Sequence, residues 1–312
     1  MPHLQKNSRP IPILVTGAHR SGTTWVGKML AAAPQTAYIS EPLNVLHRRG
    51  VYRADVDHWS TYITEENETK YLSAFQELLK FQYHPFAELI SLRSRKDILR
   101  MGRDLAIFVN GKFRDQRALI KDPFAVFSAP WFAQKLNCQI VFTIRHPAGF
   151  ASSLKRLNWP FDFHHLLEQP MLMHEHLENE RVDMEKIQAD DIVGQSALLW
   201  RMVYRSVHTT LGLFPHFKIV RHEDLSLDPV TGYKSLYESL GLNFTDNVRE
   251  TILNSSSSEN PSELSKKKIY SVKLNSRANM DNWKNRLAVD EITRIRKMTE
   301  DVSHLFYSDS EW

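Results

Sequence analysis

The sequence has 312 residues, of which 42% are hydrophobic and 11% aromatic, so it can bury the core of one large domain. Its net charge of +4 suits an anionic ligand but falls short of the dense Lys/Arg runs of an obligate nucleic-acid-binding protein, so we expect no nucleic-acid partner. The single cysteine, Cys138, excludes an internal disulfide and a cluster of thiolates that could bind zinc or iron. We find no signal peptide and no apolar run of about 18 residues, which predicts a cytoplasmic protein without a membrane span.

The first ordered elements are predicted after a polar, proline-containing arm at residues 1–10, and we expect one domain over residues 11–308. The apolar run IPILVTG predicts a strand, and TTWVGKMLAAA, with apolar residues at helical spacing, predicts a helix. GAHRSGTTW, residues 17–25, joins the two. A phosphate-binding loop occupies the same position between a strand and a helix.

Two further units repeat this order of strand and helix. The run QIVFTI at 139–144 predicts a buried strand, and Pro147 suits the first turn of the helix that follows. A third strand, FKIVRH at 217–222, precedes the helical YKSLYESLGL. Strands that alternate with helices predict right-handed parallel crossovers, and hence an α/β, P-loop-containing, three-layer fold with a central, mostly parallel sheet flanked by helices.

The remaining stretches predict helices and one loop. Residues 66–105 and 162–212 are each long enough for several helices. We expect no metal site at HEH, residues 174–176, because residues two apart on a helix point to different faces. Residues 254–276, rich in serine and lysine, predict a mobile loop, and the apolar stripe over 283–305 predicts a closing amphipathic helix.

The segment GAHRSGTTW keeps the glycines and a hydroxyl of a phosphate-binding loop, G-x-x-x-x-G-K-[ST], but Thr23 replaces its lysine. Backbone N–H groups, the positive end of the next helix and the hydroxyls can still surround a phosphate. An NTPase also needs a strand-end aspartate for Mg²⁺, whereas the strand at 139–144 is followed by Arg145. Arg20 in the loop adds a second cation. These residues predict a metal-free site for a short phosphate chain with a second anion nearby.

Together, these motifs resemble those of sulfotransferases that use 3′-phosphoadenosine 5′-phosphosulfate (PAPS). RSGTTW at 20–25 resembles the family's 5′-phosphosulfate loop, and IRHPAGFASS at 144–153 resembles its 3′-phosphate motif. EDLSLDP, SLGL and NWKNRL also recur in the family. ISEPLNV at 39–45 is similar to the E-P-L of carbohydrate sulfotransferases, which sets the chain closer to the carbohydrate and bacterial members than to the cytosolic aryl branch.

The resemblance implies a set of residues that bind the cofactor PAPS. Arg145 and Ser153 would hold the 3′-phosphate through charge-assisted contacts. Arg277 matches, in part, a basic position from which the family reaches the same phosphate, which makes residues 254–276 a lid. The 5′-phosphosulfate would be held by Arg20, Ser21, Gly22, Thr23, Thr24 and Trp25.

The resemblance also implies the catalytic groups. Negative charge builds on the bridging oxygen during sulfuryl transfer, and Arg20 and Lys121 are the cations expected beside it. Aryl-type members place a histidine base two residues after this lysine, where the chain has Pro123, so Glu41 is the expected base. Three other residues compete for this role: His19, His146 and, more weakly, Asp122.

These inferences predict an enzyme: a sulfotransferase that moves the sulfuryl group of PAPS to a hydroxyl of a small-molecule or glycan acceptor by metal-free in-line displacement. The E-P-L motif favours a carbohydrate or glycolipid acceptor, and residues 46–105 and 158–210 are expected to form its cleft. Two other classes stay open, a P-loop kinase or NTPase and a non-catalytic nucleotide-binding protein. The sequence does not decide whether the protein is a homo-oligomer.

Overall fold

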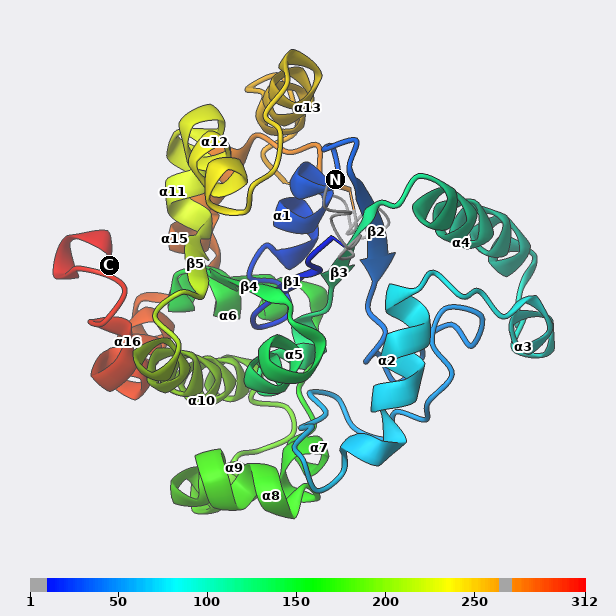
Figure 1. Ribbon diagram of the computed structural model, residues 1–312. Helices are drawn as coiled ribbons and strands as arrows, with labels where there is room; N and C mark the ends of the chain where they lie inside the picture. The colour runs from blue at the N-terminus through cyan, green and yellow to red at the C-terminus, as the bar shows by residue number, and fades with distance from the viewer. Residues whose placement is uncertain (1–9, 264–270) are drawn as a thin grey trace.

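Five short strands form one sheet in the computed structural model, which describes residues 10–263 and 271–312. The strands are β1 (Ile13–Thr16), β2 (Thr36–Ser40), β3 (Arg117–Lys121), β4 (Gln139–Ile144) and β5 (Lys218–Arg221). Their order across the sheet is β2-β3-β1-β4-β5, and every pairing is parallel (Figure 1). The predicted α/β fold, with a parallel sheet flanked by helices, is therefore confirmed.

Helices connect these strands, because parallel neighbours need a crossover that returns the chain to the same end of the sheet. The first half of the chain has α1 (Thr23–Leu30), α2 (Leu72–Leu79), α3 (Pro85–Ile90), α4 (Arg95–Phe113), α5 (Ala129–Leu136) and α6 (Pro147–Leu157). The middle has α7 (His164–Leu167), α8 (Pro170–Leu172), α9 (Arg181–Lys186) and α10 (Ile192–Leu213). The last part has α11 (His222–Leu227), α12 (Pro229–Ser239), α13 (Asp246–Ser256), α14 (Ser276–Met280), α15 (Asn282–Arg286) and α16 (Val289–Ser303).

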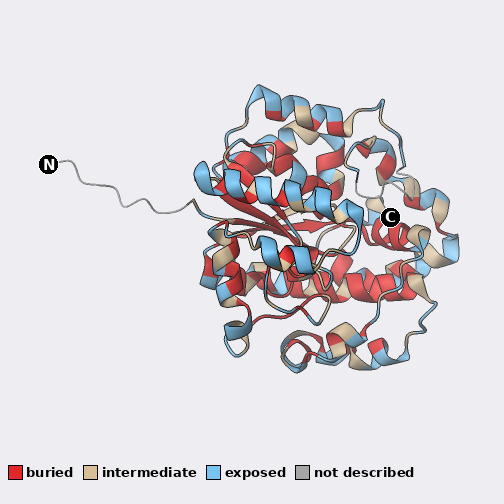
Figure 2. Cartoon of the chain, turned by 90° about the vertical axis from the view of Figure 1, so that its right-hand side faces the viewer, coloured by how far each residue is buried: buried red, intermediate tan, exposed pale blue. Residues whose placement is uncertain are grey.

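The side chains of the strands alternate between two hydrophobic cores, one on each face of the sheet. Ile13 and Val15 of β1 belong to a core that α1, α12 and α13 complete. Leu14 belongs to the opposite core, to which α5, α6 and α10 contribute. Buried residues accordingly gather in the strands and α10, and exposed residues on the outer helices (Figure 2). A sheet covered on both faces explains why β1 and β4 are almost uninterrupted apolar runs.

The turn from β1 into α1 depends on two glycines. Gly17 has a φ of +139°, and a Cβ atom on it would lie 2.3 Å from the carbonyl oxygen of Thr143 in β4. Gly22 has a φ of +104° and is the N-cap of α1. Only glycine adopts such conformations without strain and permits this close approach of the neighbouring strand. The loop therefore lies directly against β4, the strand that leads into Arg145.

Two strands, β2 and β3, were not expected from the sequence. Arg117 and Lys121 flank the three apolar residues of β3, and both are buried. The guanidinium of Arg117 is satisfied by carbonyl oxygens, among them that of Leu240 at 2.6 Å. A strand that begins and ends with a buried cation does not resemble an apolar run in the sequence.

The C-terminal part differs from the single amphipathic helix predicted over 283–305. Helix α15 ends at Arg286, Leu287 has an extended backbone with φ −97° and ψ 141°, and α16 begins at Val289. The break buries Trp283 and Leu287 in a small core with α6 and α10. The predicted loop at 254–276 begins within the last turn of α13, and part of it, residues 264–270, lies outside the described residues, as do residues 1–9 of the predicted arm.

Replacing Gly17 by alanine is expected to destabilise the fold by about 2 kcal/mol or more, because the new methyl group meets the carbonyl oxygen of Thr143 at an unfavourable φ. Chemical denaturation would measure this change. The control is Gly102→Ala in α4, where no atom lies within 4 Å of the added Cβ and the substitution should stabilise the helix by roughly 0.5–1 kcal/mol. Equal effects of the two substitutions would contradict the close packing of the loop on β4.

Candidate functional site

The carboxyl ends of the five parallel strands meet at one edge of the sheet, where ligands bind in open α/β folds. The phosphate-loop segment GAHRSGTTW follows β1, and Glu41 follows β2. Lys121 is the last residue of β3, Arg145 follows β4, and His222 follows β5. Each strand therefore delivers a polar or charged group to the same edge.

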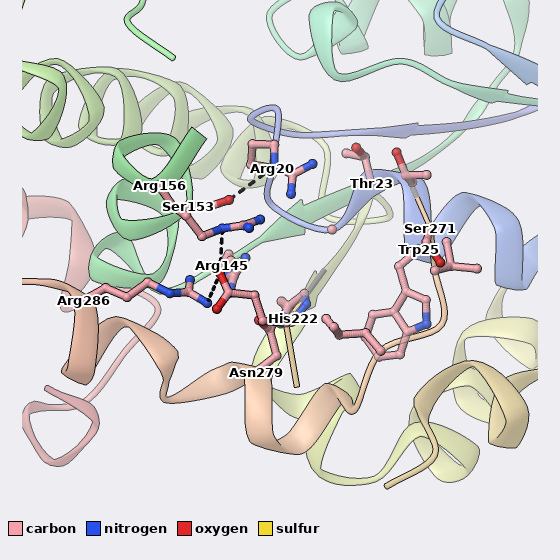
Figure 3. A pocket seen from close by; sticks show the side chains of 15 residues that line it. Arg20, Thr23, Trp25, Arg145, Ser153, Arg156, His222, Ser271, Asn279 and Arg286 are labelled. Atoms are coloured by element: carbon pink, nitrogen blue, oxygen red, sulfur yellow. Dashed lines mark hydrogen bonds and ion pairs between the residues drawn. The ribbon is translucent and has the colours of Figure 1, made fainter. Parts of the chain in front are cut away.

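Arg20 of the loop and Arg145 line one pocket, which we call the anion pocket (Figure 3). The Nε–H of Arg20 donates a hydrogen bond to the Ser153 hydroxyl at 3.3 Å, across 133 residues of sequence. The two motifs that were interpreted as phosphate sites thus border a single cavity. The other described residues that line it include Gly22, Thr23, Thr24, Trp25, Arg156, His222, Asn279 and Arg286.

Arg145 is a buried cation, only 8% exposed. Burial lowers the pKa of its guanidinium, and the nearby carboxylate of Glu223 partly offsets this effect. Glu223 does not pair with it directly: it accepts hydrogen bonds from the His146 backbone N–H at 2.9 Å and the Tyr307 hydroxyl at 3.0 Å. Among the residues that the structure describes, Arg145 has no ion-pair partner. A buried guanidinium that lines a pocket and has no ion-pair partner there is suited to bind an anion.

Two further arginines, Arg156 of α6 and Arg286 of α15, complete the positive wall of this pocket. Each lies 3.1 Å from the same carboxylate oxygen of Glu263, which bridges them. Neither arginine was predicted as a site residue, although Arg156 lies just after the motif IRHPAGFASS and Arg286 lies within NWKNRL. Arg277, in contrast, lies on the exposed start of α14 and does not line the pocket, so the structure does not bring it together with Arg145.

The residues of the loop have different orientations. The Ser21 hydroxyl lies 2.6 Å from that of Thr143 in the protein interior, so it faces away from the pocket. Thr23 and Thr24 line the pocket at the N-terminus of α1, where backbone N–H groups and the helix dipole favour an anion. Trp25 is held by a hydrogen bond from its indole N–H to Ser255 at 3.1 Å. Its ring forms an apolar wall of the same pocket.

Glu41 and Lys121, predicted as base and cation, form an ion pair. Lys121 is 2% exposed, and the Glu41 carboxylate also accepts a hydrogen bond from the Asn44 amide at 2.8 Å. Glu41 has a φ of +52°, and Arg20 has a φ of +69°, conformations that are uncommon for residues other than glycine and that often mark functional sites. Both residues border a second cavity, next to the anion pocket.

This second cavity has a volume of about 450 Å³ and is largely aromatic. We call it the aromatic cavity; its rings come from His19, Trp59, Phe124, Trp159, Phe161 and His165. His19 stacks on Phe161, and burial lowers its pKa to about 4, with a smaller contribution from Arg20. Its imidazole is therefore neutral at physiological pH and lies in the same cavity as Glu41.

The two remaining candidates for the base, His146 and Asp122, make contacts that stabilise the fold. His146 stacks on Trp283 and contacts Tyr307 and Trp312, and burial lowers its pKa to about 3. It lines neither the anion pocket nor the aromatic cavity. Asp122 accepts hydrogen bonds from the backbone N–H groups of Leu43 at 2.6 Å and Phe124 at 2.9 Å, which ties the E-P-L turn to the end of β3. Burial raises its pKa to about 7.

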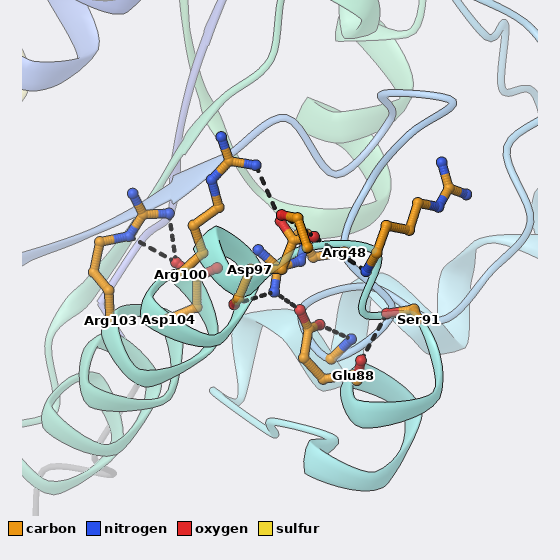
Figure 4. Close-up of polar contacts among 10 residues, drawn as sticks. Arg48, Glu88, Ser91, Asp97, Arg100, Arg103 and Asp104 are labelled. Atoms are coloured by element: carbon orange, nitrogen blue, oxygen red, sulfur yellow. Dashed lines mark hydrogen bonds and ion pairs between the residues drawn. The ribbon is translucent and has the colours of Figure 1, made fainter.

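A third cavity, of about 610 Å³, lies on the other side of Glu41, between β2 and α4. We call it the basic cavity, because Lys28, Arg48, Arg100, Arg103 and Lys121 line it. Carboxylates hold its arginines: Arg48 pairs with buried Glu88, and Arg103 donates to Asp104 at 2.7 Å (Figure 4). Arg48 also donates to the carbonyl oxygen of Asp97 at 3.2 Å, which fastens the start of α4 to the loop after Glu41.

The chain resembles in structure the sulfotransferase domain of the Synechococcus PCC 7002 olefin synthase, with 18% identity, coverage of 99% of this chain and 98% of the other, and a TM-score of 0.49. The sulfotransferase domain of the curacin biosynthetic pathway is 15% identical, with 96% and 99% coverage and a TM-score of 0.48. Mouse sulfotransferase SULT7A1, complexed with PAP, is 12% identical, with 97% and 88% coverage and a TM-score of 0.44.

The comparison with curated proteins gave no match. A family model, described as the sulfotransferase family, matches residues 12–246. This match spans well over half of the sequence and includes the loop after β1, Glu41, Lys121 and the Arg145 motif. The chain therefore belongs to the sulfotransferase family.

Proposed function

We propose that this sulfotransferase takes its sulfuryl group from PAPS and transfers it to a hydroxyl of a carbohydrate or glycolipid acceptor. The observation that carries the proposal is the single pocket shared by Arg20 and Arg145, in which Arg20 also contacts Ser153 at 3.3 Å. A nucleotide with anionic groups at both ends requires cations at two separated points of one cavity. A turn with only a structural role would not need two arginines that line the same pocket.

The residues of the pocket fit the two ends of such a nucleotide. Arg145, buried and without an ion-pair partner in the described part of the chain, would hold the 3′-phosphate with Ser153. Arg286 and Arg156, which line the pocket, would make the contact to this phosphate for which the sequence suggested Arg277. Backbone N–H groups at the start of α1 and the hydroxyls of Thr23 and Thr24 would hold the 5′ end, and Trp25 offers a flat wall.

PAPS supplies the sulfuryl group, whose transfer leaves negative charge on the bridging oxygen of the nucleotide. Arg20 and Lys121 are the cations that we assign to this charge. Arg20 lines both the anion pocket and the aromatic cavity, and Lys121 lines the basic cavity, where it pairs with Glu41, a residue that also lines the aromatic cavity. One well-placed donor of this kind stabilises a transition state by a few kcal/mol. These fixed guanidinium and ammonium groups can provide the countercharge that a divalent metal provides in NTPases.

Glu41 is the base that we propose for the acceptor hydroxyl. Its carboxylate lies between the aromatic and basic cavities, and Lys121 and Asn44 fix its orientation. His19 is the alternative, since it is neutral and lines the same aromatic cavity. Proton removal by a positioned base contributes roughly 10²–10⁴-fold to such rates.

The aromatic cavity supports an acceptor that presents a flat or apolar face beside its hydroxyl. Trp59, Phe124 and Trp159 line this cavity next to Glu41, with a few polar groups to fix orientation, as is usual for small-molecule sites. A sugar ring has such a face, as does the sugar of a glycolipid. The choice of a carbohydrate over other hydroxyl compounds rests on the E-P-L motif that contains Glu41.

The function is tested by incubating the protein with PAPS and a panel of saccharides, glycolipids, phenols and sterols, with detection of sulfated product by mass. We expect a product from the carbohydrate part of the panel, at a rate that EDTA does not change. Sulfation of phenols alone would reject the proposed acceptor class. A strict requirement for a divalent metal would reject the proposed charge compensation.

Arg145→Met should weaken the binding of 3′,5′-bisphosphoadenosine by about 10–100-fold, because a charge-assisted contact worth about 1.5–3 kcal/mol is lost. Methionine keeps an unbranched apolar chain against Gly149, so the fold should persist. Calorimetry with adenosine 5′-monophosphate, which lacks the 3′-phosphate, is the matched control, and its affinity should change little. Equal losses for both nucleotides would contradict the 3′-phosphate assignment.

Glu41→Gln should lower kcat by about 10²-fold or more with little change in the affinity for 3′,5′-bisphosphoadenosine, because the amide keeps the size of the side chain but cannot accept the proton. Steady-state kinetics and calorimetry measure the two quantities. The companion variant His19→Asn should retain most of the activity. The opposite pattern, an active Glu41 variant and an inactive His19 variant, would transfer the role of base to His19.

A further inference from the structure

Helices α3 and α4 expose an unusual amount of apolar surface. Half of the large hydrophobic side chains that are exposed in the described part of the chain belong to these two helices. Four of them are among the most exposed side chains of the group: Phe86 at 80%, Ile90 at 88%, Leu99 at 79% and Phe113 at 86%. The two helices lie together at one side of the molecule, beyond the edge strand β2 (Figure 1), and Figure 2 turns this side toward the viewer. Exposed apolar patches of this kind usually mark an interaction surface.

The exposed apolar residues of α4 share one face of the helix rather than lying at scattered positions. Ile98, Leu105, Val109 and Phe113 have the spacing i, i+7, i+11 and i+15, which places them on one face of the helix, with Leu99 at its margin. A different face, with Phe108 and Gly111, is buried against the rest of the protein. We call the exposed face the α4 stripe. The apolar residues of this exposed face are therefore not used in packing α4 on the rest of the protein.

The charge of α4 and its flanking residues indicates what kind of surface the stripe would contact. Residues 93–115 contain seven Lys or Arg and three Asp, a net charge of +4 in a chain whose total net charge is +4. Lys96, Arg103 and Arg114 share a helical face along one side of the stripe, and all three are exposed. An apolar stripe bordered by cations is the pattern of a helix that lies in the interface of an anionic lipid membrane.

We propose that α3 and α4 dock on the surface of an anionic lipid bilayer, with the α4 stripe inserted at the level of the headgroups. Two copies of this chain would bring two regions of charge +4 together, whereas anionic lipids neutralise that charge. The stripe lies on the outside of a helix, and a fluid bilayer receives protruding side chains without a complementary groove. In the described residues no helix is long and apolar enough to cross a membrane, so the protein would lie on the bilayer.

The position of the stripe relative to the basic cavity indicates which part of the protein would face the lipid headgroups. Arg100 and Arg103 of α4 line that cavity, and Arg103 also belongs to the cationic side of the stripe. Docking through the stripe would therefore bring one wall of the basic cavity close to the lipid headgroups. This inference goes beyond the proposed function and does not depend on it, because membrane binding is measured without nucleotide or acceptor.

The test is co-sedimentation of the purified protein with vesicles. We expect binding to vesicles of equal parts phosphatidylcholine and phosphatidylglycerol, weakening as salt is raised, and little binding to phosphatidylcholine alone. The triple variant Lys96→Gln, Lys112→Gln, Arg114→Gln should bind about tenfold more weakly or worse, since these exposed residues border the stripe. The control removes three exposed cations elsewhere, Lys234→Gln, Arg249→Gln and Lys297→Gln, and should bind as the wild type does.

A second set of variants separates apolar insertion from charge attraction. Ile98→Gln, Val109→Gln and Phe113→Gln combined should reduce vesicle binding about tenfold or more, whereas Val182→Gln, Leu213→Gln and Val289→Gln, at exposed positions elsewhere, should not. Circular dichroism and nucleotide affinity verify that each variant is folded. Failure of the wild type to bind phosphatidylglycerol vesicles would overturn the proposal. Unchanged binding of the variant that replaces Ile98, Val109 and Phe113 would also overturn it. A third contradicting result would be a dimer, detected by light scattering, that the variant of Ile98, Val109 and Phe113 dissociates. The stripe would then be an interface between two copies of the chain.

Discussion

The loop after β1 lies against Thr143 of β4, and this contact determines where Arg20 and Arg145 lie in the pocket that they share. Gly17 leaves room for the Thr143 carbonyl oxygen, and the Ser21 hydroxyl lies 2.6 Å from the Thr143 hydroxyl. Arg145 follows two residues later along the chain, whereas Arg20 directly precedes Ser21. The loop can therefore move little relative to Arg145, and Arg20 reaches Ser153 on the helix beyond it. A pocket with two cationic ends results from the contact of two neighbouring parallel strands.

The buried cations at this edge of the sheet differ in whether they have an ion-pair partner. Arg145 is buried without an ion-pair partner in the described residues, which suits the recruitment of an anion, whereas Lys121 is buried with Glu41 as its counterion. A buried ammonium group costs free energy unless it is paired, so Glu41 and Lys121 stabilise each other's position. Asp122 reinforces this arrangement by accepting a hydrogen bond from the backbone N–H of Leu43, two residues after Glu41. The E-P-L segment is thus held by three side chains from the end of β3 and its own turn.

The parts of this structure that follow from local sequence patterns could be predicted, and those that depend on distant packing could not. The strand at 139–144 has the predicted bounds, because an uninterrupted apolar run with helical flanks has few other solutions. Strand β3 was missed because its buried cations, Arg117 and Lys121, are satisfied by groups far along the chain. Arg156 and Arg286 reach the pocket of Arg145 only because α6 and α15 pack together, and Arg277 is directed elsewhere by the short helix α14. The break at Leu287, which the apolar stripe over 283–305 conceals, is likewise set by packing against α6 and α10.

Glu263 bridges Arg156 and Arg286, and its carboxylate therefore occupies the position of an anion inside a pocket built for anions. A phosphate group that engages these arginines must displace this carboxylate, so its arrival exchanges one negative charge for another. Much of the electrostatic gain from the two arginines is then already present in the free protein. The affinity for the nucleotide should consequently depend on ionic strength less steeply than the number of arginines around the pocket would suggest.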